Sequence, residues 1–343
     1  EDDFKIDIVT ARREYYEYPA ALPVVEKGSI KDDLFRRDFT VNSMAIKLNK
    51  REFGMLVDFY GGRKDLMSGL IRILYNLSFI EDPTRIFRAI RFEQRYGFKM
   101  EDKTLGFAVN AIQSGVLNDV SRERINFEFF ALLKEKNILG ILDRMSELSI
   151  LEKIYPEVKY TENVRKTFKN CDEWLTDFQN SLNSMENIDR ILLYILILHS
   201  NMDALNTLAS SEKMRLTREY REEISKLIDA RDNTLPHLLR DTGVSSFDIY
   251  NALKGLSIEV LFVLYLLNDN TLLRNRVIDY INRLRSIKTS ITGKDLKELG
   301  IKPGPLFKSI LDKVLEEKVN GSITTYEEEL ELAGKIKDTK ENG

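Results

Sequence analysis

Residues 81–92 constrain this chain more than any other stretch, because they read as an unusually well-marked helix start. They run Glu-Asp-Pro-Thr-Arg-Ile-Phe-Arg-Ala-Ile-Arg-Phe. Asp82 fits the N-cap of a helix and Pro83 fits its first position, where a missing N–H costs nothing. Glu81 and Asp82 are therefore expected to open a helix that carries everything up to Phe92.

Three arginines follow that helix start at intervals of three. Arg85, Arg88 and Arg91 are expected to lie as neighbours on one side of the helix. Each pair of like charges costs roughly 0.2–0.5 kcal/mol when nothing neutralises it. Such a row suits a helix that faces a polyanion, because the planar guanidinium binds phosphate through two bonds at once. The alternative is an ordinary surface helix whose arginines only keep it soluble.

The composition narrows the chemistry. The 343 residues carry a net charge of −3, which argues against a strongly basic DNA-coating protein. Cys171 is the single cysteine and His199 and His237 the only histidines, so no intramolecular disulfide and no Cys/His zinc site is expected. A catalytic metal would be held by carboxylates, which favours Mg²⁺ or Mn²⁺. The apolar run Ile191–Leu198 is too short to cross a membrane, so we expect a cytoplasmic protein.

The first part of the chain mixes strand and helix patterns. Phe4–Thr10 alternates as a strand would, with Asp7 on the face opposite Ile6 and Ile8. The other elements expected here are a loop at Arg12–Gly28, a helix that begins at Asp32–Phe39 and carries on through Asn42–Ile46, a strand at Met55–Phe59 with a turn at Gly61 and Gly62, and a strand at Leu70–Leu74.

Beyond Pro83 apolar residues recur at three and four positions, which predicts helices almost throughout. The expected helices are Glu101–Ser114, Arg122–Lys134, Ile138–Leu148, Ile188–Leu198, Glu212–Asp229, Ser246–Leu253, Ile258–Leu267 and Asn275–Leu284, with a last unit at Thr292–Leu332. The fold class predicted is α+β and mostly helical: a small mixed portion followed by a long helical array.

Two constellations carry chemistry besides the arginine row. Arg36, Arg37, Asp38 and Asn42 place two guanidiniums, a carboxylate and an amide within one or two turns, where the carboxylate can orient an arginine and accept a sugar hydroxyl. A solvated helix with Asp38 merely paired to an arginine is the alternative. Asp7 can supply one carboxylate to a two-metal site but not the whole site, and it can equally face water.

The motifs, taken in order, resemble a known family. Ile-Asp-Ile-Val-Thr-Ala-Arg, Arg-Arg-Asp-Phe-Thr-Val-Asn, Asp-Phe-Tyr-Gly-Gly-Arg-Lys-Asp-Leu, Glu-Asp-Pro-Thr-Arg and Val-Ser-Arg-Glu-Arg-Ile follow one another over residues 6–125. This series resembles the class II tRNA nucleotidyltransferases, which are the bacterial CCA-adding and A-adding enzymes, and the related bacterial poly(A) polymerases. The resemblance implies a partial nucleotidyltransferase (palm-like) β-sheet head at residues 1–75, a helical neck with the nucleotide-recognition helix at 76–150, a helical body at 151–285 and an RNA-binding helical tail at 286–343.

The resemblance also implies roles for individual residues. Asp82 and Arg85 are expected to pair with the edge of the base, and Arg88 and Arg91 to hold the triphosphate. Arg37 is expected to touch the nucleotide directly. The full set of expected nucleotide-binding residues is Arg36, Arg37, Asp38, Asn42, Glu81, Asp82, Arg85, Arg88 and Arg91. Asp7 is the expected catalytic residue and metal ligand, and the expected neck motif is Ser121, Arg122, Glu123 and Arg124.

One departure from the family pattern concerns the metal site. The Asp-x-Asp pair and the Gly-Gly-x-x-Arg-Asp loop lie upstream of the strand that holds Asp7 in relatives, and this chain has neither in that position. We therefore expect that the chain lacks the first part of the catalytic head and is inactive as given.

The expected function of the intact protein is template-independent addition of CCA, or of the terminal A, to the 3′ end of tRNA. The expected substrates are ATP, with CTP as a further candidate, and the expected chemistry is two-metal nucleotidyl transfer with Mg²⁺ or Mn²⁺. The alternatives are a poly(A) polymerase and a catalytically silent fragment that binds tRNA and nucleotide. Basic residues that could touch RNA, or simply form a solvated face, are Lys294, Lys297, Lys302 and Lys308.

Overall fold

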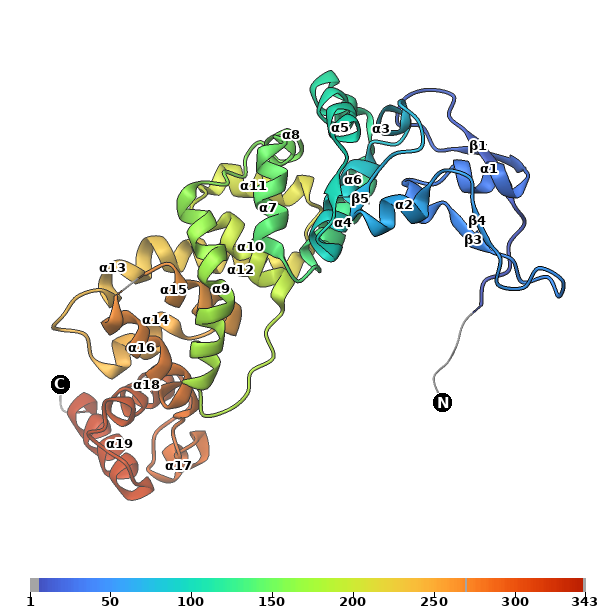
Figure 1. Ribbon diagram of the computed structural model, residues 1–343. Coiled ribbons are helices and arrows are strands. Elements are labelled where there is room, and N and C mark those ends of the chain that lie inside the picture. Colours follow the sequence, from blue (N-terminus) through green and yellow to red (C-terminus); the bar gives the residue numbers. More distant parts are fainter. Residues whose placement is uncertain (1–5, 269, 342–343) are drawn as a thin grey trace. The chain divides into compact units, whose positions relative to one another are not determined.

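The computed structural model describes residues 6–268 and 270–341 (Figure 1). The chain divides into two compact units: residues 1–168 with 205–216, and residues 169–204 with 217–343. Helices dominate both units and the strands are short, so the prediction of an α+β, mostly helical chain is confirmed.

The strands of the first unit form three two-stranded sheets. They are β1 (Arg12–Tyr15) with β2 (Val24–Lys27), β3 (Met44–Ile46) with β4 (Leu56–Asp58), and β5 (Leu70–Ile71) with β6 (Lys99–Met100). The first two pairs are antiparallel and the third is parallel. The strand predicted at Met55–Phe59 is confirmed as β4, and a two-residue strand lies within the predicted Leu70–Leu74.

Helix α4 lies against other helices of the first unit, and its apolar face is buried. The helices of this unit are α1 (Ile30–Phe35), α2 (Gly62–Met67), α3 (Ser78–Glu81), α4 (Thr84–Tyr96), α5 (Asp102–Ser114), α6 (Arg122–Leu133), α7 (Ile138–Glu147) and α8 (Ile150–Ile154), with α11 (Ala204–Lys213) and the first part of α9 (Glu162–Asn180). Ile86, Phe87 and Ile90 of α4 have no exposed surface, and α4 packs against α6 and α7. This burial holds the arginine row in place.

The strand predicted at Phe4–Thr10 is wrong for residues 6–10; Phe4 lies outside the described residues. Ile8 is 94% exposed, and residues 6–10 pair with no strand in the described part of the chain. Alternation alone does not hold a strand, because its backbone groups need a neighbour to bond. The strand forms instead at Arg12–Tyr15, inside the region expected to be a loop, because Val24–Lys27 returns beside it.

The helix predicted from Asp32 through Ile46 is also wrong beyond α1. Helix α1 starts with a capping box of Ser29 and Asp32 and ends at Phe35. Asp38 then accepts the backbone N–H of Phe39, and such local bonds compete with a helix. The chain continues through a 3-10 turn at Thr40–Asn42 into β3.

The second unit is built of helices. They are the rest of α9, α10 (Arg190–His199), α12 (Arg218–Asp229), α13 (Leu235–Leu238), α14 (Ser246–Leu253), α15 (Ile258–Leu266), α16 (Thr271–Asn282), α17 (Gly293–Glu298), α18 (Pro305–Asn320) and α19 (Tyr326–Glu341). The central pair α10 and α15 is apolar on nearly every side and is buried accordingly. Among the described residues no single helix is long and apolar enough to span a membrane, whereas α14 and α15 together, bent by 115°, meet the length and composition test.

Gly62 provides the first testable prediction. A Cβ at this position would lie 2.2 Å from the carbonyl oxygen of Thr40, whereas a Cβ at Gly106, within α5, would meet nothing within 4 Å. Gly62→Ala should therefore destabilise the protein by about 1–3 kcal/mol. The control Gly106→Ala should stabilise it by about 0.5–1 kcal/mol, because alanine favours a helix over glycine. Urea unfolding checks both, and equal effects would show that the close approach at Gly62 is wrong.

Cys171 is expected to react slowly in the native protein. Its thiol is buried in α9, and burial raises the pKa to about 12, because a thiolate loses its hydration there. At pH 8 the native protein should therefore react very slowly with a thiol reagent such as DTNB, whereas the urea-unfolded chain should release one equivalent at once. Fast reaction of the native protein would contradict the packing of α9.

Candidate functional site

One pocket of the first unit collects most of the residues that are expected from the sequence to bind a nucleotide. It has a volume of about 440 Å³ and is lined from β1, from the segment that follows α1 and from the start of α4. Its lining residues are Arg12, Glu14, Tyr16, Pro23, Arg36, Arg37, Asp38, Asn42, Asp82, Arg85 and Arg88. Five arginines and three carboxylates meet there, an excess of positive charge that suits an anionic ligand.

Arg85 is buried in this pocket, with a side chain that is 5% exposed. Its Nη1 donates to Ser78 Oγ (2.7 Å) and to the Tyr75 hydroxyl (3.3 Å). Its Nη2 donates to the Arg36 carbonyl (3.0 Å) and the Tyr16 hydroxyl (3.3 Å). Burial alone would lower the pKa of Arg85, yet the pKa is raised because neighbours such as Tyr75 and Tyr16 favour the charged form. The cation is thus held by neutral acceptors.

Asp82 faces the remaining N–H of Arg85. Its Oδ2 lies 3.7 Å from Arg85 Nε, which is too long for a hydrogen bond. Its Oδ1 accepts from the hydroxyl of Thr84 (2.6 Å) and from Arg124 Nη2 (2.7 Å). Asp82 is therefore fixed through one oxygen, and the other oxygen stands beside a guanidinium N–H without bonding to it.

The prediction that Glu81 and Asp82 open one long helix is wrong for Glu81. Glu81 does not open the long helix but ends the short α3, and α4 begins at Thr84. The Asp82 side chain still accepts the N–H of Thr84 (3.2 Å), as an N-capping carboxylate does.

Asp38 connects the segment after α1 to α4. Its Oδ1 accepts from the Phe39 N–H (2.9 Å) and the Asn42 side-chain amide (2.8 Å), and its Oδ2 accepts from Arg88 Nε (2.7 Å). Asn42 and Phe39 therefore orient the carboxylate, and the carboxylate orients Arg88. Both oxygens of Asp38 are used in this way, so its side chain holds one fixed position at the edge of the pocket.

Asp33 organises the other two arginines. Its Oδ1 accepts from Arg36 Nε (3.0 Å) and Nη2 (2.9 Å), while its Oδ2 accepts from Arg37 Nη2 (3.2 Å). Burial would raise the pKa of Asp33, but these arginines hold the pKa below its usual value. Arg36 is also bonded to Glu14, whereas Arg37 has Asp33 as its one bonded partner among the described residues and is 42% exposed, so Arg37 keeps N–H groups for a ligand.

Glu81 and Arg91 are not among the lining residues. Glu81 accepts the hydroxyl of Tyr75 (2.6 Å) instead. Arg91 Nη1 lies 3.9 Å from Glu128 Oε2 of α6, and its buried Nε has no hydrogen-bond partner. Six residues of a helix turn the side chain about 120° away from Arg85, so a row spaced by three cannot keep all its members on one face.

The neck motif stabilises the start of α6. Ser121 is the N-cap, Arg122 donates to the carbonyl of Ile154 (2.9 Å) and Glu123 pairs with Arg215. These contacts tie α6 to α8 and to the segment after α11 and lie outside the pocket.

Arg124 differs from the rest of that motif, because it reaches the site. It bonds Asp82 through Nη2 and the carbonyl of Ala20 through Nη1 (2.9 Å). Ala20 is buried with a φ of 60°, a conformation that costs a residue with a Cβ some strain. Arg124 therefore holds the β1–β2 connection and Asp82 at the same time.

The pocket also holds residues that the sequence analysis missed: Arg12, Glu14, Tyr16 and Pro23. A signal for three of them exists, because Arg12, Glu14 and Tyr16 alternate with a period of two, which places their side chains on one face of β1 and its continuation. The prolines at positions 19 and 23 favour a loop instead and obscure this alternation.

The predicted metal ligand stands apart. Asp7 is exposed and belongs to no strand. Within residues 6–268 and 270–341 no three His, Cys, Asp or Glu side chains are grouped so as to hold a metal ion. The described residues thus do not provide the donor set of a two-metal site, and no step can be derived through such a site here.

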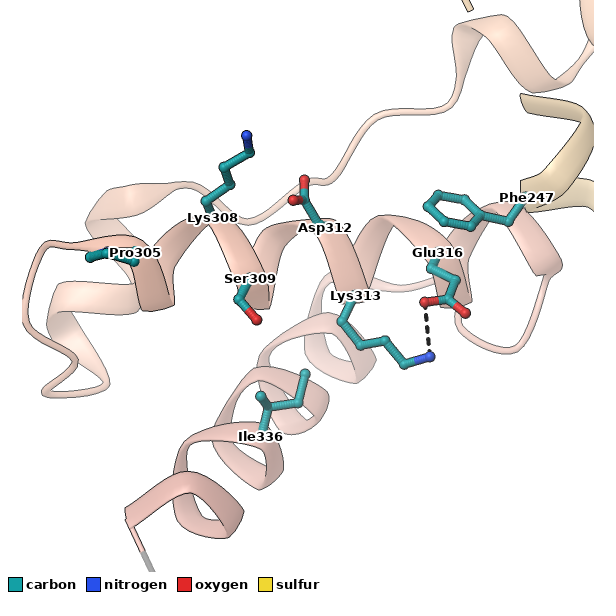
Figure 2. Close-up of a pocket in the computed structure, with 8 residues that line it drawn as sticks. All are labelled: Phe247, Pro305, Lys308, Ser309, Asp312, Lys313, Glu316 and Ile336. Atoms are coloured by element: carbon teal, nitrogen blue, oxygen red, sulfur yellow. Dashed lines mark ion pairs between the residues drawn. The ribbon is translucent and has the colours of Figure 1, made fainter. Parts of the chain in front are cut away.

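A second pocket, of about 600 Å³, lies in the second unit along α18 (Figure 2). Figure 2 shows Pro305 and Phe247 near its two ends and Ile336 of α19 on one side. Lys313 is paired with Glu316 (2.9 Å), while Lys308 is exposed. Its charges are mixed and it lacks the convergent arginines of the first pocket.

Comparison with known proteins bears on both units. Residues 1–72 match the family described as the poly A polymerase head domain. The A-adding tRNA nucleotidyltransferase of Geobacter sulfurreducens is 39% identical over 345 residues, covering 98% of this chain and 39% of that protein. The A-adding tRNA nucleotidyltransferase of Halalkalibacterium halodurans is 31% identical, covering 97% of this chain and 74% of that protein. The chain thus spans well under half the length of the first of these relatives.

Solved structures of similar fold include CCA-adding enzymes as well. The Thermotoga maritima CCA-adding enzyme complexed with tRNA is 33% identical with a TM-score of 0.74, covering 89% of this chain and 73% of that one. A CCA-adding enzyme complexed with ATP is 29% identical with a TM-score of 0.74, covering 94% and 79%. By sequence and by fold, the chain belongs to the family of A-adding and CCA-adding tRNA nucleotidyltransferases.

Proposed function

We propose that the protein to which this chain belongs adds nucleotides, either CCA or the terminal A, to the 3′ end of tRNA. We propose further that the pocket beside α4 selects the nucleotide. The observation that carries the proposal is the pair formed by Asp82 and Arg85, an unbonded acceptor 3.7 Å from an unbonded donor in a pocket lined by arginines. A cytoplasmic location and the use of Mg²⁺ are parts of the same proposal.

This donor–acceptor pair matches the edges of only two of the four bases. Adenine presents an amino group beside a ring nitrogen that accepts a hydrogen bond, and cytosine does the same. Asp82 Oδ2 can accept from the amino group and Arg85 Nε can donate to the ring nitrogen. Guanine and uracil present a carbonyl and a ring N–H in the opposite order, so a site built in this way leaves them with unpaired polar groups.

The triphosphate would meet the more exposed arginines. Arg37 has N–H groups to spare, and Arg12, whose side chain is 47% exposed, pairs with Glu14 alone (2.9 Å) in the described part of the chain. Guanidiniums of this kind bind phosphate oxygens in pairs. Arg88 is partly neutralised by Asp38, which orients it, so Arg88 contributes a positioned charge at the edge of the pocket.

The reaction would be an in-line attack of the tRNA 3′ hydroxyl on the α-phosphate, with pyrophosphate leaving. The described residues bind and orient the nucleotide for this step: the base against Asp82 and Arg85, the phosphates toward Arg37 and Arg12. Asp7 stays a predicted ligand of Mg²⁺.

Exposed lysines of the last helices are the proposed contacts with tRNA. Lys294, Lys297, Lys302 and Lys308 are all exposed. Lys294 lies 3.8 Å from Glu298, whereas no ion pair of Lys302 or Lys308 occurs within the described residues. The relative from Thermotoga maritima whose name includes tRNA supports the choice of ligand.

Incubation of the protein to which this chain belongs with tRNA, Mg²⁺ and labelled ATP tests the proposal. Incorporation of a single A, or completion of CCA when CTP is added, supports it. Long A tracts would instead identify a poly(A) polymerase. Binding of tRNA and ATP without incorporation would favour a binding module, and absence of both kinds of binding would overturn the proposed site.

The two arginines at the start of α4 should behave differently when removed. Arg85→Ala should lower the preference for ATP over GTP by about tenfold, because a bidentate base contact contributes that much discrimination. Arg88→Ala should lower the binding affinity for all four nucleotides by about tenfold and keep their ranking. The variant loses one positive charge in the pocket and leaves Asp38 Oδ2 without its arginine partner.

Equilibrium binding of the four nucleoside triphosphates measures both effects. Arg63→Ala, which removes an exposed arginine of α2 outside the pocket, is the matched control. Wild-type ranking among the four nucleotides in the Arg85 variant would show that the base is not read there.

The tail lysines should contribute charge without sequence preference. Replacing Lys302 and Lys308 together by alanine should reduce the slope of log affinity for tRNA against log salt concentration by about 2, because each lysine that neutralises a phosphate adds about one unit to that slope. Lys335→Ala is the control, since this lysine is paired with Glu331 (2.6 Å) in the same unit. An unchanged slope would remove the tail from the RNA interface.

A further inference from the structure

A chain of hydrogen bonds links Glu81 to Arg85 through the hydroxyl of Tyr75. Tyr75 donates its proton to Glu81 Oε2 (2.6 Å), and its oxygen accepts from Arg85 Nη1 (3.3 Å). The Tyr75 ring stacks on Phe35 with 5.2 Å between the ring centres and 30° between their planes. Tyr75 and Glu81 are not among the lining residues of the pocket, and the Tyr75 hydroxyl connects them to Arg85, which is one of those lining residues.

The direction of this chain is fixed. A phenol has one hydrogen, and the Glu81 carboxylate can only accept it, so the lone pairs of Tyr75 are left for Arg85. Burial raises the pKa of Tyr75, so the proton stays on the phenol. The stacked ring limits how far the oxygen can move, and the acceptor for Arg85 Nη1 therefore has a defined place.

That defined place determines the plane of the guanidinium. The hydroxyls of Tyr75 and Ser78 accept hydrogen bonds from Nη1. The Tyr16 hydroxyl and the Arg36 carbonyl accept hydrogen bonds from Nη2. Only Nε is left, and it faces Asp82. A guanidinium that turned in its plane or tilted would lose this match, and it could then offer N–H groups to the guanine carbonyl as well.

We propose that Tyr75 is a positioning residue for base selection: it holds the Arg85 guanidinium in the plane that favours adenine over guanine, and Glu81 acts through it. This inference rests on the proposed function. It moves Glu81 from direct contact with the nucleotide to support of the residue that makes the contact. A merely structural tyrosine would need its ring but not its hydroxyl.

Tyr75→Phe tests the proposal, because it keeps the ring on Phe35 and removes only the hydroxyl. The ratio of ATP to GTP affinity should fall about threefold to tenfold, the range of one net hydrogen bond. Glu81→Gln should lower the same ratio in the same direction. Tyr60→Phe is the matched control: its ring also contacts Phe35, but its hydroxyl donates to the Lys31 carbonyl, away from Arg85.

The effect must depend on Arg85. In an Arg85→Ala background, adding Tyr75→Phe should leave the ATP to GTP ratio unchanged, since residues that act as one unit are not additive. A second readout follows the guanidinium itself: in ¹⁵N-arginine spectra, rotation of the Arg85 side chain about its Cζ–Nε bond should become faster in Tyr75→Phe and stay slow in Tyr60→Phe.

The outcomes separate this inference from the proposed function. A wild-type chain that binds neither ATP nor GTP overturns the proposed function, and the role of Tyr75 with it. A wild-type chain that prefers ATP while Tyr75→Phe keeps the same ratio overturns the role of Tyr75 alone. A fall in the ratio that persists without Arg85 also overturns it, because Tyr75 would then act by another route.

Discussion

The buried guanidinium of Arg85 is the constraint on which the rest of the site depends. A charge removed from water is costly unless its hydrogen bonds are restored, and here the acceptors are hydroxyls and a carbonyl. They come from Tyr16 after β1, Arg36 after α1, Tyr75 before α3 and Ser78 within it. The hydrogen bonds of Arg85 are complete only when all four acceptors are in place, so the buried charge depends on the packing of these segments.

The carboxylates of the site divide into two kinds. Asp33 and Asp38 spend both oxygens on arginines and backbone, so they position other groups. Asp82 keeps one oxygen beside an N–H that it does not bond. This division separates the residues that shape the pocket from the pair that can distinguish one base from another. The paired carboxylates also offset the repulsion among the five arginines that line this pocket.

Elements with a regular apolar periodicity could be predicted from the sequence. Helices α5, α6, α7, α14 and α15 follow from apolar spacing, whereas α9 was not predicted. Asp82 marks the start of α4 to within two residues, since an N-cap is a local signal. Failures came where distant segments decide. The strand at Arg12–Tyr15 needs Val24–Lys27 beside it, and α1 stops because Asp38 bonds its neighbour's backbone.

The same limit applied to the site. A motif that spans a single turn placed Arg85 and Arg88 in one pocket, but the rotation of the helix carried Arg91 toward Glu128. Tyr16 was missed because the nearby prolines obscure its alternation with Arg12 and Glu14, and because its partner, Arg85, lies 69 positions away in the chain. Contacts of that range depend on the fold.

A structure of this chain with bound ATP tests the central claim most directly. The adenine edge should lie within hydrogen-bond distance of Asp82 Oδ2 and Arg85 Nε, and the phosphates should lie toward Arg37. Adenine bound elsewhere, or seated in the pocket with its edge turned away from both residues, would contradict the account of how the base is read.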